Sequence, residues 1–186
     1  LCDGEFFHIC CSALILNLIG QEGLKGDSAT FNKIRESVKY VKGSESSLKK
    51  FEECVVKVGG IDTSISLRLD VSTLWNSTYL MLDSAIKYKK TFASLPWNDR
   101  NYKYCPSSEE WLRGEKVCEF VGSFYDTTNL IYGSYYPTSN MYFMQVLKLL
   151  KENLLNEDVV VCDMCKRMKE KFDKYWSQYI IQVRNG

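Results

Sequence analysis

Two scarcities limit what this sequence can be: it has one histidine and almost no net charge. His8 lies in an aromatic run with no serine or cysteine at a spacing that suggests a nucleophile–base pair, so we interpret it as structural. A formal net charge of +1 differs from the strongly basic balance of domains that bind DNA by electrostatics alone. A local basic patch is still compatible with that total.

Long hydrophobic runs and nucleotide-binding loops are also lacking. The longest apolar stretch, residues 13–19, is interrupted by Asn17 and is far shorter than the roughly 20 residues of a membrane span. The sequence has no phosphate-binding loop, no Gly-rich dinucleotide turn and no hydrolase nucleophile elbow. No signal peptide is evident, which predicts a reducing, intracellular compartment. We therefore expect no membrane partner, no small-molecule substrate and no cofactor.

Cysteine is plentiful, with eight residues. Most of them lie in apolar runs, as Cys54 and Cys118 do, where a free cysteine behaves as a small hydrophobe. Cys162 and Cys165 have the spacing of a zinc or redox motif. A zinc site needs a second pair of ligands and a redox motif needs a strand before its helix, so we favour packing cysteines and no metal site over a metal or redox role.

Helical periodicity dominates the chain. A hydrophobic content of 45% supplies a core, and 186 residues suit one domain, 1–186. Apolar residues recur at helical spacing in seven segments. These segments cover residues 12–24, 31–41, 48–55, 75–95, 107–136, 139–154 and 164–179. Pro96 is expected to end the fourth, and Ser107 with Glu110 forms a predicted capping box.

Two short segments instead predict β-strands. Residues 5–10 are aromatic and β-branched, and residues 65–70 alternate apolar with polar side chains. A single strand leaves its backbone groups unpaired, so the two strands either pair with each other or need partners from elsewhere. The predicted fold class is mainly α, with one or two short β-strands.

The acidic and basic side chains form no recognisable catalytic pattern in the sequence. Metal-dependent phosphoryl transfer needs two or three carboxylates that converge on the cations. Asp70, at the end of a predicted strand, is the best single candidate, but no second strand-borne acid accompanies it, so a helix-start or solvated role is preferred. Lys87, Lys89 and Lys90 form a small basic cluster that could contact phosphates or simply be a solvated helix face.

Several unusual strings occur together and in order along nearly the whole chain. They are residues 6–19 (FFHICCSALILNLI), 34–44 (IRESVKYVKGS), 69–79 (LDVSTLWNSTY), 107–111 (SSEEW), 136–140 (YPTSN) and 168–176 (MKEKFDKYW). In these strings the sequence resembles the hAT-superfamily DNA transposases, in particular the plant RICESLEEPER and DAYSLEEPER group of domesticated transposases. The resemblance implies a helical piece of a ribonuclease H-like transposase core with a helical insertion.

The resemblance also implies that no catalytic residue lies in this chain. In the family, two catalytic aspartates precede the segment that is similar to residues 6–10, and a glutamate follows the segment that is similar to residues 172–176. Because the chain begins at Leu1 and not at Met, a fragment is expected. The BED zinc finger and the C-terminal dimerisation region of the family are not expected in it.

Two signature positions depart from the family. The Cys-x-x-His pattern falls on Cys11 and Leu14, and the Arg-Trp pair falls on Leu74 and Trp75, so the histidine and the arginine are missing. We interpret Leu14 as core. The tryptophan of that pair is linked in the family to handling the cleaved DNA end, and Trp75 could stack on a base or anchor the core of its helix.

The candidate DNA-binding residues are Trp75, Asn76, Lys87, Lys89 and Lys90. The resemblance predicts a nuclear, non-catalytic, transposase-derived domain that associates weakly with DNA through its parent architecture. The alternatives are a helical scaffold that binds protein partners, a non-functional transposon remnant, and an active metal-dependent nuclease, which would need acids that the chain does not supply.

Overall fold

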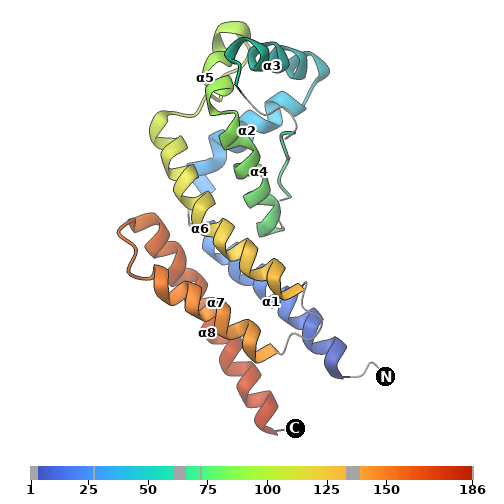
Figure 1. Ribbon diagram of the computed structural model, residues 1–186, viewed down its shortest axis with the longest axis vertical. Helices are drawn as coiled ribbons and strands as arrows, with labels where there is room; N and C mark the ends of the chain where they lie inside the picture. The colour runs from blue at the N-terminus through green and yellow to red at the C-terminus, as the bar shows by residue number, and fades with distance from the viewer. Residues whose placement is uncertain (1–3, 27, 61–65, 72, 133–138, 186) are drawn as a thin grey trace. The chain divides into compact units, whose positions relative to one another are not determined.

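The computed structural model describes residues 4–26, 28–60, 66–71, 73–132 and 139–185, and the side chains of residues 14–26, 31–60, 66–71, 73–129 and 144–177. These ranges contain eight helices and no strand, which confirms the mainly α prediction (Figure 1). The helices are α1 Gly4–Lys25, α2 Ser28–Lys42, α3 Glu45–Val58, α4 Trp75–Lys87, α5 Lys89–Asn98, α6 Ser108–Tyr132, α7 Ser139–Asn153 and α8 Val159–Asn185. None of the described helices is both long and apolar enough to cross a membrane.

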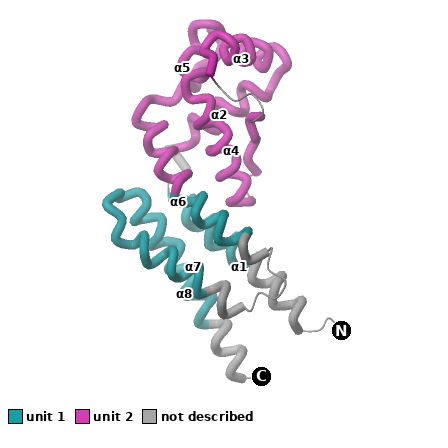
Figure 2. The backbone as a smooth tube through the Cα atoms, in the orientation of Figure 1, with its two compact units in different colours: residues 1–26, 120–186 teal, residues 27–119 magenta. Residues whose placement is uncertain are grey.

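The chain divides into two compact units, coloured separately in Figure 2. Unit 1 comprises residues 1–26 and 120–186, and unit 2 comprises residues 27–119. Helix α6 contributes its first half to unit 2 and its second half to unit 1. The expectation of a single domain stays a prediction.

Unit 2 has an aromatic core. The apolar stripe of α2 is buried, as its helical spacing predicts, with Ile34 and Val38 fully inaccessible to solvent. Phe92 of α5 is also fully buried, and its ring centroid lies 5.0 Å from that of Phe51 in α3 and 5.9 Å from that of Trp111 in α6. Such tilted aromatic pairs add to the stabilisation that burial of their area provides.

Buried polar groups complete this core. Asp99 is 2% exposed and accepts hydrogen bonds from the Tyr40 hydroxyl at 2.8 Å and from the Asn101 backbone N–H at 3.1 Å. Its carboxylate also forms an ion pair with Lys50 Nζ at 3.0 Å. These partners compensate for the cost of removing a carboxylate from water.

Unit 1 is built from α1, α7, α8 and the second half of α6, and α1 packs mainly against α8. Its core side chains are mostly aliphatic or methionine. Leu16, Ile19, Val146, Leu150, Val161, Met164, Met168 and Phe172 are all buried. The helical stripe predicted for residues 164–179 is therefore confirmed through Phe172, Tyr175 is half-buried, and the side chain of Tyr179 lies outside the described ranges.

The start of α6 confirms the predicted capping box. The Glu110 carboxylate accepts a hydrogen bond from the Ser107 backbone N–H at 2.7 Å, and the Glu110 backbone N–H donates to Ser107 Oγ at 3.2 Å. The same carboxylate forms an ion pair with Lys33 of α2 at 3.0 Å. One glutamate thus caps α6 and binds it to α2.

Both strand predictions are wrong within the described residues. Residues 5–10 belong to α1, because a short apolar run without a sheet partner is equally compatible with a buried helix. Residues 66–70 are irregular, and residue 65 lies outside the described ranges. Side chains replace a neighbouring strand there: Lys42 Nζ donates to the Leu67 carbonyl at 2.9 Å and the Arg68 N–H donates to Ser84 Oγ at 3.1 Å.

The helix predicted for residues 75–95 is two helices, α4 and α5, which meet at Tyr88. Tyr88 has φ −99° and ψ 15°, outside the α-helical region, and its side chain is buried. Pro96 does not end α5, which continues to Asn98. Proline cannot donate to the Phe92 carbonyl, and that oxygen instead accepts from Cys105 Sγ at 3.6 Å, which offsets the lost bond.

The interpretation of Leu14 as core is also wrong, since this side chain is 59% exposed. An apolar helix need not be buried on every side, and the buried face of α1 is the one that carries Leu16 and Ile19.

Candidate functional site

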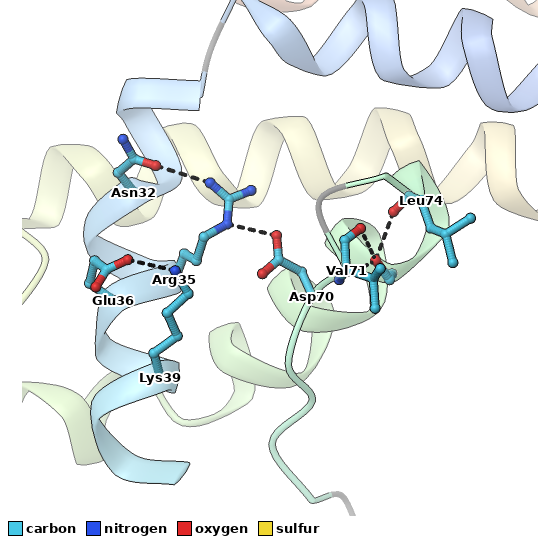
Figure 3. Close-up of polar contacts among 8 residues, drawn as sticks. Asn32, Arg35, Glu36, Lys39, Asp70, Val71 and Leu74 are labelled. Atoms are coloured by element: carbon cyan, nitrogen blue, oxygen red, sulfur yellow. Dashed lines mark hydrogen bonds and ion pairs between the residues drawn. The ribbon is translucent and has the colours of Figure 1, made fainter. Parts of the chain in front are cut away.

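The carboxylate singled out by its sequence position, Asp70, forms a shielded ion pair with Arg35 of α2 (Figure 3). The Arg35 Nε and Asp70 Oδ2 atoms are 2.6 Å apart, and the two side chains are 18% and 4% exposed respectively. Arg35 also donates to Asn32 Oδ1 at 3.0 Å, which fixes the guanidinium from the other side. Asp70 is therefore not a solvated acid, so that interpretation is wrong, and it does not cap α4, whose N-cap residue is Leu74.

Asp70 is followed by Val71 and Leu74, which lead into α4 (Figure 3), and the Ser77 side chain bonds to both of them. The Val71 backbone N–H donates to Ser77 Oγ at 2.7 Å, and the Ser77 hydroxyl lies 2.7 Å from the Leu74 carbonyl. Leu74 precedes the helix without a side-chain cap, so a serine within the first turn of α4 provides the polar contacts there. The ion pair and the Ser77 contacts together fix where α4 begins.

Trp75 and Asn76 open α4 with opposite environments. Trp75 is 6% exposed, whereas Asn76 is exposed to solvent. Burial of the indole favours the core-anchor interpretation of Trp75, because a base can stack only on an accessible ring face. Asn76 is available for polar contacts.

The lysine cluster is partly neutralised. Lys87 Nζ lies 2.7 Å from Asp83 within α4, and Lys89 Nζ lies 2.9 Å from Glu115 of α6. Lys90 is exposed and forms no ion pair with any described residue. Only one of the three cations is thus free of a carboxylate that would compete with a phosphate.

The five candidate residues do not converge on one site. Asn76 and Lys87 lie on the same face of α4, but eleven residues separate them, about 16 Å along a helix axis. Lys89 and Lys90 belong to the next helix, α5. The arrangement is a set of polar side chains spread over two helices.

Acids and thiols are likewise dispersed. Within the described ranges, no group of three or more histidine, cysteine, aspartate or glutamate side chains could hold a metal ion. Asp3 and Asp62, and the side chain of Glu5, lie outside those ranges. Cys165 is fully buried, and burial, with a smaller contribution from Cys162, raises the pKa of its thiol to about 12, which suits a packing cysteine.

Sequence reasoning missed two residues. Arg35 is the partner of Asp70, but it lies 35 residues earlier, and no local pattern connects them. Trp97 is 91% exposed, although a tryptophan after an apolar helix is usually a core residue. The helical spacing could have predicted this exposure, because Trp97 falls on the face of α5 opposite to the buried Phe92 and Leu95.

Comparisons with known proteins match residues 9–120 to the family described as the ZBED1 RNase-like helical domain. The chain is 39% identical to zinc finger BED domain-containing protein RICESLEEPER 2 of Oryza sativa subsp. japonica, over 93% of the chain and 24% of that protein. It is 37% identical to the putative AC transposase of Zea mays, over 95% of the chain and 22% of that protein. No solved structure matches. The chain therefore spans about a quarter of the length of these curated relatives.

Proposed function

The chain belongs to the ZBED1 RNase-like helical domain family and is a hAT-like, plant transposase-derived domain, and from this premise we propose that it is non-catalytic and associates with DNA through its parent architecture. The observation that carries the non-catalytic part is the Asp70–Arg35 pair. A carboxylate oxygen held 2.6 Å from a guanidinium, on a side chain that is 4% exposed, is a poor ligand for a catalytic cation.

The remaining described acids support the same conclusion. Asp83 pairs with Lys87, and Asp99 is enclosed by Tyr40 and Lys50. Strand cleavage by two-metal chemistry needs carboxylates that bridge cations about 4 Å apart. None of these acids is placed for that role, so the domain would support DNA handling by other parts of a longer protein.

We propose weak DNA contact through Asn76, Lys87, Lys89 and Lys90, with Trp75 holding the first turn of α4 in place. Exposed Asn76 and unpaired Lys90 make the main polar contacts. Lys87 and Lys89 contribute less, because each must first leave its carboxylate partner. A nuclear location follows from the same proposal, since the relatives are named as transposases or zinc finger BED proteins.

The test is a mobility-shift titration of the full chain on duplex DNA at two salt concentrations, with a cleavage assay in magnesium and manganese. We expect weak binding with a shallow salt dependence, because few phosphates are neutralised, and no cleavage. A Lys90→Ala variant should bind less tightly and reduce the salt slope by about one. Tight, salt-steep binding would contradict the weak-affinity part, and metal-dependent cleavage that an Asp70→Asn variant abolishes would contradict the non-catalytic part.

A second candidate function, a helical scaffold for protein partners, is favoured by one observation. Two apolar residues are exposed where α7 is joined to α8: Leu155 of the connection, at 92%, and Val159, the first residue of α8, at 72%. Sedimentation of the wild-type chain and of a Leu155→Ser, Val159→Ser variant would test it. Self-association that the variant loses supports the scaffold, whereas a wild-type monomer that captures no partner in pull-downs counts against it.

A further inference from the structure

Helix α5 presents an exposed face whose role the preceding sections leave open. Lys90, Ala93 and Trp97 are all exposed and follow the i, i+3, i+7 spacing of one helix face. The opposite face carries Phe92 and Leu95, which are fully buried in unit 2. Trp97, at 91% exposed, is the most accessible large hydrophobic side chain among the described residues of this unit. Packing in the core therefore does not explain the position of its indole.

The backbone beneath Trp97 is held firmly. Asn98 Oδ1 accepts a hydrogen bond from Lys57 of α3 at 2.8 Å. Asp99 is buried among Tyr40 and Lys50, and its carbonyl accepts the Tyr102 N–H at 3.1 Å in the turn that follows α5. Because both residues after Trp97 are held by these contacts, the backbone that carries the indole is already ordered. Binding a ligand should therefore cost little backbone entropy.

The charge around Trp97 is positive. In residues 89–104 the only acid is Asp99, which is 2% exposed and paired with Lys50. Arg100 and Lys103 are exposed, and neither forms an ion pair with any described residue. The acid nearest in sequence on the facing part of α3 is Glu53, one turn before Lys57. An accessible indole among unneutralised cations is the combination that stacks on bases and contacts phosphates.

We propose that Lys90, Trp97 and Arg100 form a binding surface for single-stranded nucleic acid, in which the Trp97 indole stacks on an unpaired base. A duplex hides its base faces, so this contact selects single strands or splayed ends. Lys90 lies about 10 Å from Trp97 along the helix, and Arg100 is at most about 11 Å away along the chain. Both cations can therefore contact phosphates that flank the stacked base. The proposal rests on the proposed DNA association and names the form of DNA that this surface takes.

The experiment measures fluorescence anisotropy of a labelled oligothymidine of about 15 nucleotides, and of a hairpin duplex with the same number of phosphates, with the full chain at low salt. Trp97→Ala should weaken binding to the single strand about tenfold, since one base–aromatic stack is typically worth roughly 5- to 150-fold. Trp97→Phe should keep most of the affinity. Arg100→Ala should reduce the salt slope by roughly 0.7.

Controls separate this surface from general effects. Leu112→Ala removes another exposed apolar side chain of unit 2, which is 52% accessible, and should leave binding unchanged. Glu53→Gln should tighten binding slightly, because it removes a negative charge one helical turn from Lys57, which bonds to Asn98. Circular dichroism of each variant checks the fold, and a surface substitution is not expected to alter it.

The outcomes distinguish this proposal from the proposed function. If the wild type binds duplex and single strand equally and Trp97→Ala binds as the wild type does, the surface is refuted while DNA association stands. If the wild type binds neither nucleic acid at low salt, both are refuted. If Trp97→Ala instead abolishes self-association seen by sedimentation and leaves binding unchanged, the indole is a protein contact and the proposal is wrong.

Discussion

The two compact units bury different chemistry. Among the described residues, buried polar side chains lie almost entirely in unit 2, and Thr128 is the one in unit 1. Unit 2 also contains the Phe92 ring cluster, whereas the buried side chains of unit 1 are mostly aliphatic or methionine, with Phe124 and Phe172 also buried. Hydrogen bonds and ring contacts are directional, so unit 2 should tolerate few substitutions of its core side chains, and the flexible methionines should let unit 1 adapt to a changed shape of its own core side chains.

The largest effect should come from the aromatic cluster. We expect Phe92→Ala to lower the free energy of unfolding by about 3–5 kcal/mol, because it leaves a cavity among Phe51, Tyr102 and Trp111. Met168→Leu in unit 1, a nearly volume-conserving change, should cost less than about 1.5 kcal/mol. Urea unfolding measures both. Phe92→Leu is the control that introduces the same residue in unit 2, and equal costs for it and Met168→Leu would remove the contrast between the units.

A pair of helical glycines gives a smaller and sharper comparison. In unit 1, a Cβ at Gly23 would lie 2.6 Å from Met168 Cγ and 2.7 Å from its Sδ, so two atoms of a buried side chain must move. In unit 2, a Cβ at Gly114 would lie 2.9 Å from the terminal Cδ1 of Ile34. Alanine gains about 1 kcal/mol of helix propensity at either site.

We therefore expect Gly23→Ala to be destabilising by about 1–2 kcal/mol and Gly114→Ala to be nearly neutral. Thermal unfolding of both variants, with an exposed-site substitution as the reference, measures the difference. If Gly23→Ala is stabilising, the Met168 side chain can move away from the added methyl group at little cost. Unit 1 would then be more adaptable than the short Gly23–Met168 distance suggests.

The smallest effect should be a dependence on pH. Burial raises the pKa of Asp99, but hydrogen bonds from Tyr40, Lys50 and the Asn101 N–H outweigh it, and the pKa lies below its ordinary value. A lowered pKa in the folded state means that the stabilisation is complete above the unfolded value, near pH 4, and is lost as the pH falls through the folded value. Unit 2 should therefore weaken in acid.

Urea midpoints at about pH 6 and pH 3 test this expectation. The wild type should lose more stability over that interval than Asp99→Asn, which lacks the titrating carboxylate. Glu22→Gln is the matched variant in unit 1, where a hydrogen bond from Lys25 lowers the pKa of a carboxylate that is 27% exposed. Its effect should be smaller, because solvent screens that group. An equal effect in both variants would show that buried polar bonds do not distinguish the units.

Local patterns in the sequence predicted local structure well. The buried stripe of α2 and the Ser107–Glu110 capping box follow from spacing and residue type alone, and both are present. Predictions that depended on distant partners were wrong. The segment 66–70 has strand periodicity but no neighbouring strand, and its bonds come from Lys42 and Ser84. Pro96 lies within α5, and Cys105, nine residues later, bonds to the Phe92 carbonyl that the proline leaves free.

The candidate site shows the same difference between local patterns and distant contacts. The sequence identified its residues, but not which of them are buried or paired. Asp70 is neutralised by an arginine 35 residues away, and the exposure of Trp97 depends on which face of α5 packs inward. The DNA-contact roles of Asn76 and Lys90 stay a prediction, because accessibility permits contact and does not demonstrate it.

The double role of Glu110 restricts how this surface position can change during evolution. Its carboxylate caps α6 through Ser107 and also pairs with Lys33 of α2. Glutamine would keep the cap and lose the charge, aspartate would be too short to reach back, and lysine would lose both contacts and repel Lys33. Selection for stability should therefore retain glutamate at position 110, although 24% of its side chain is accessible to solvent and no DNA contact is proposed for it.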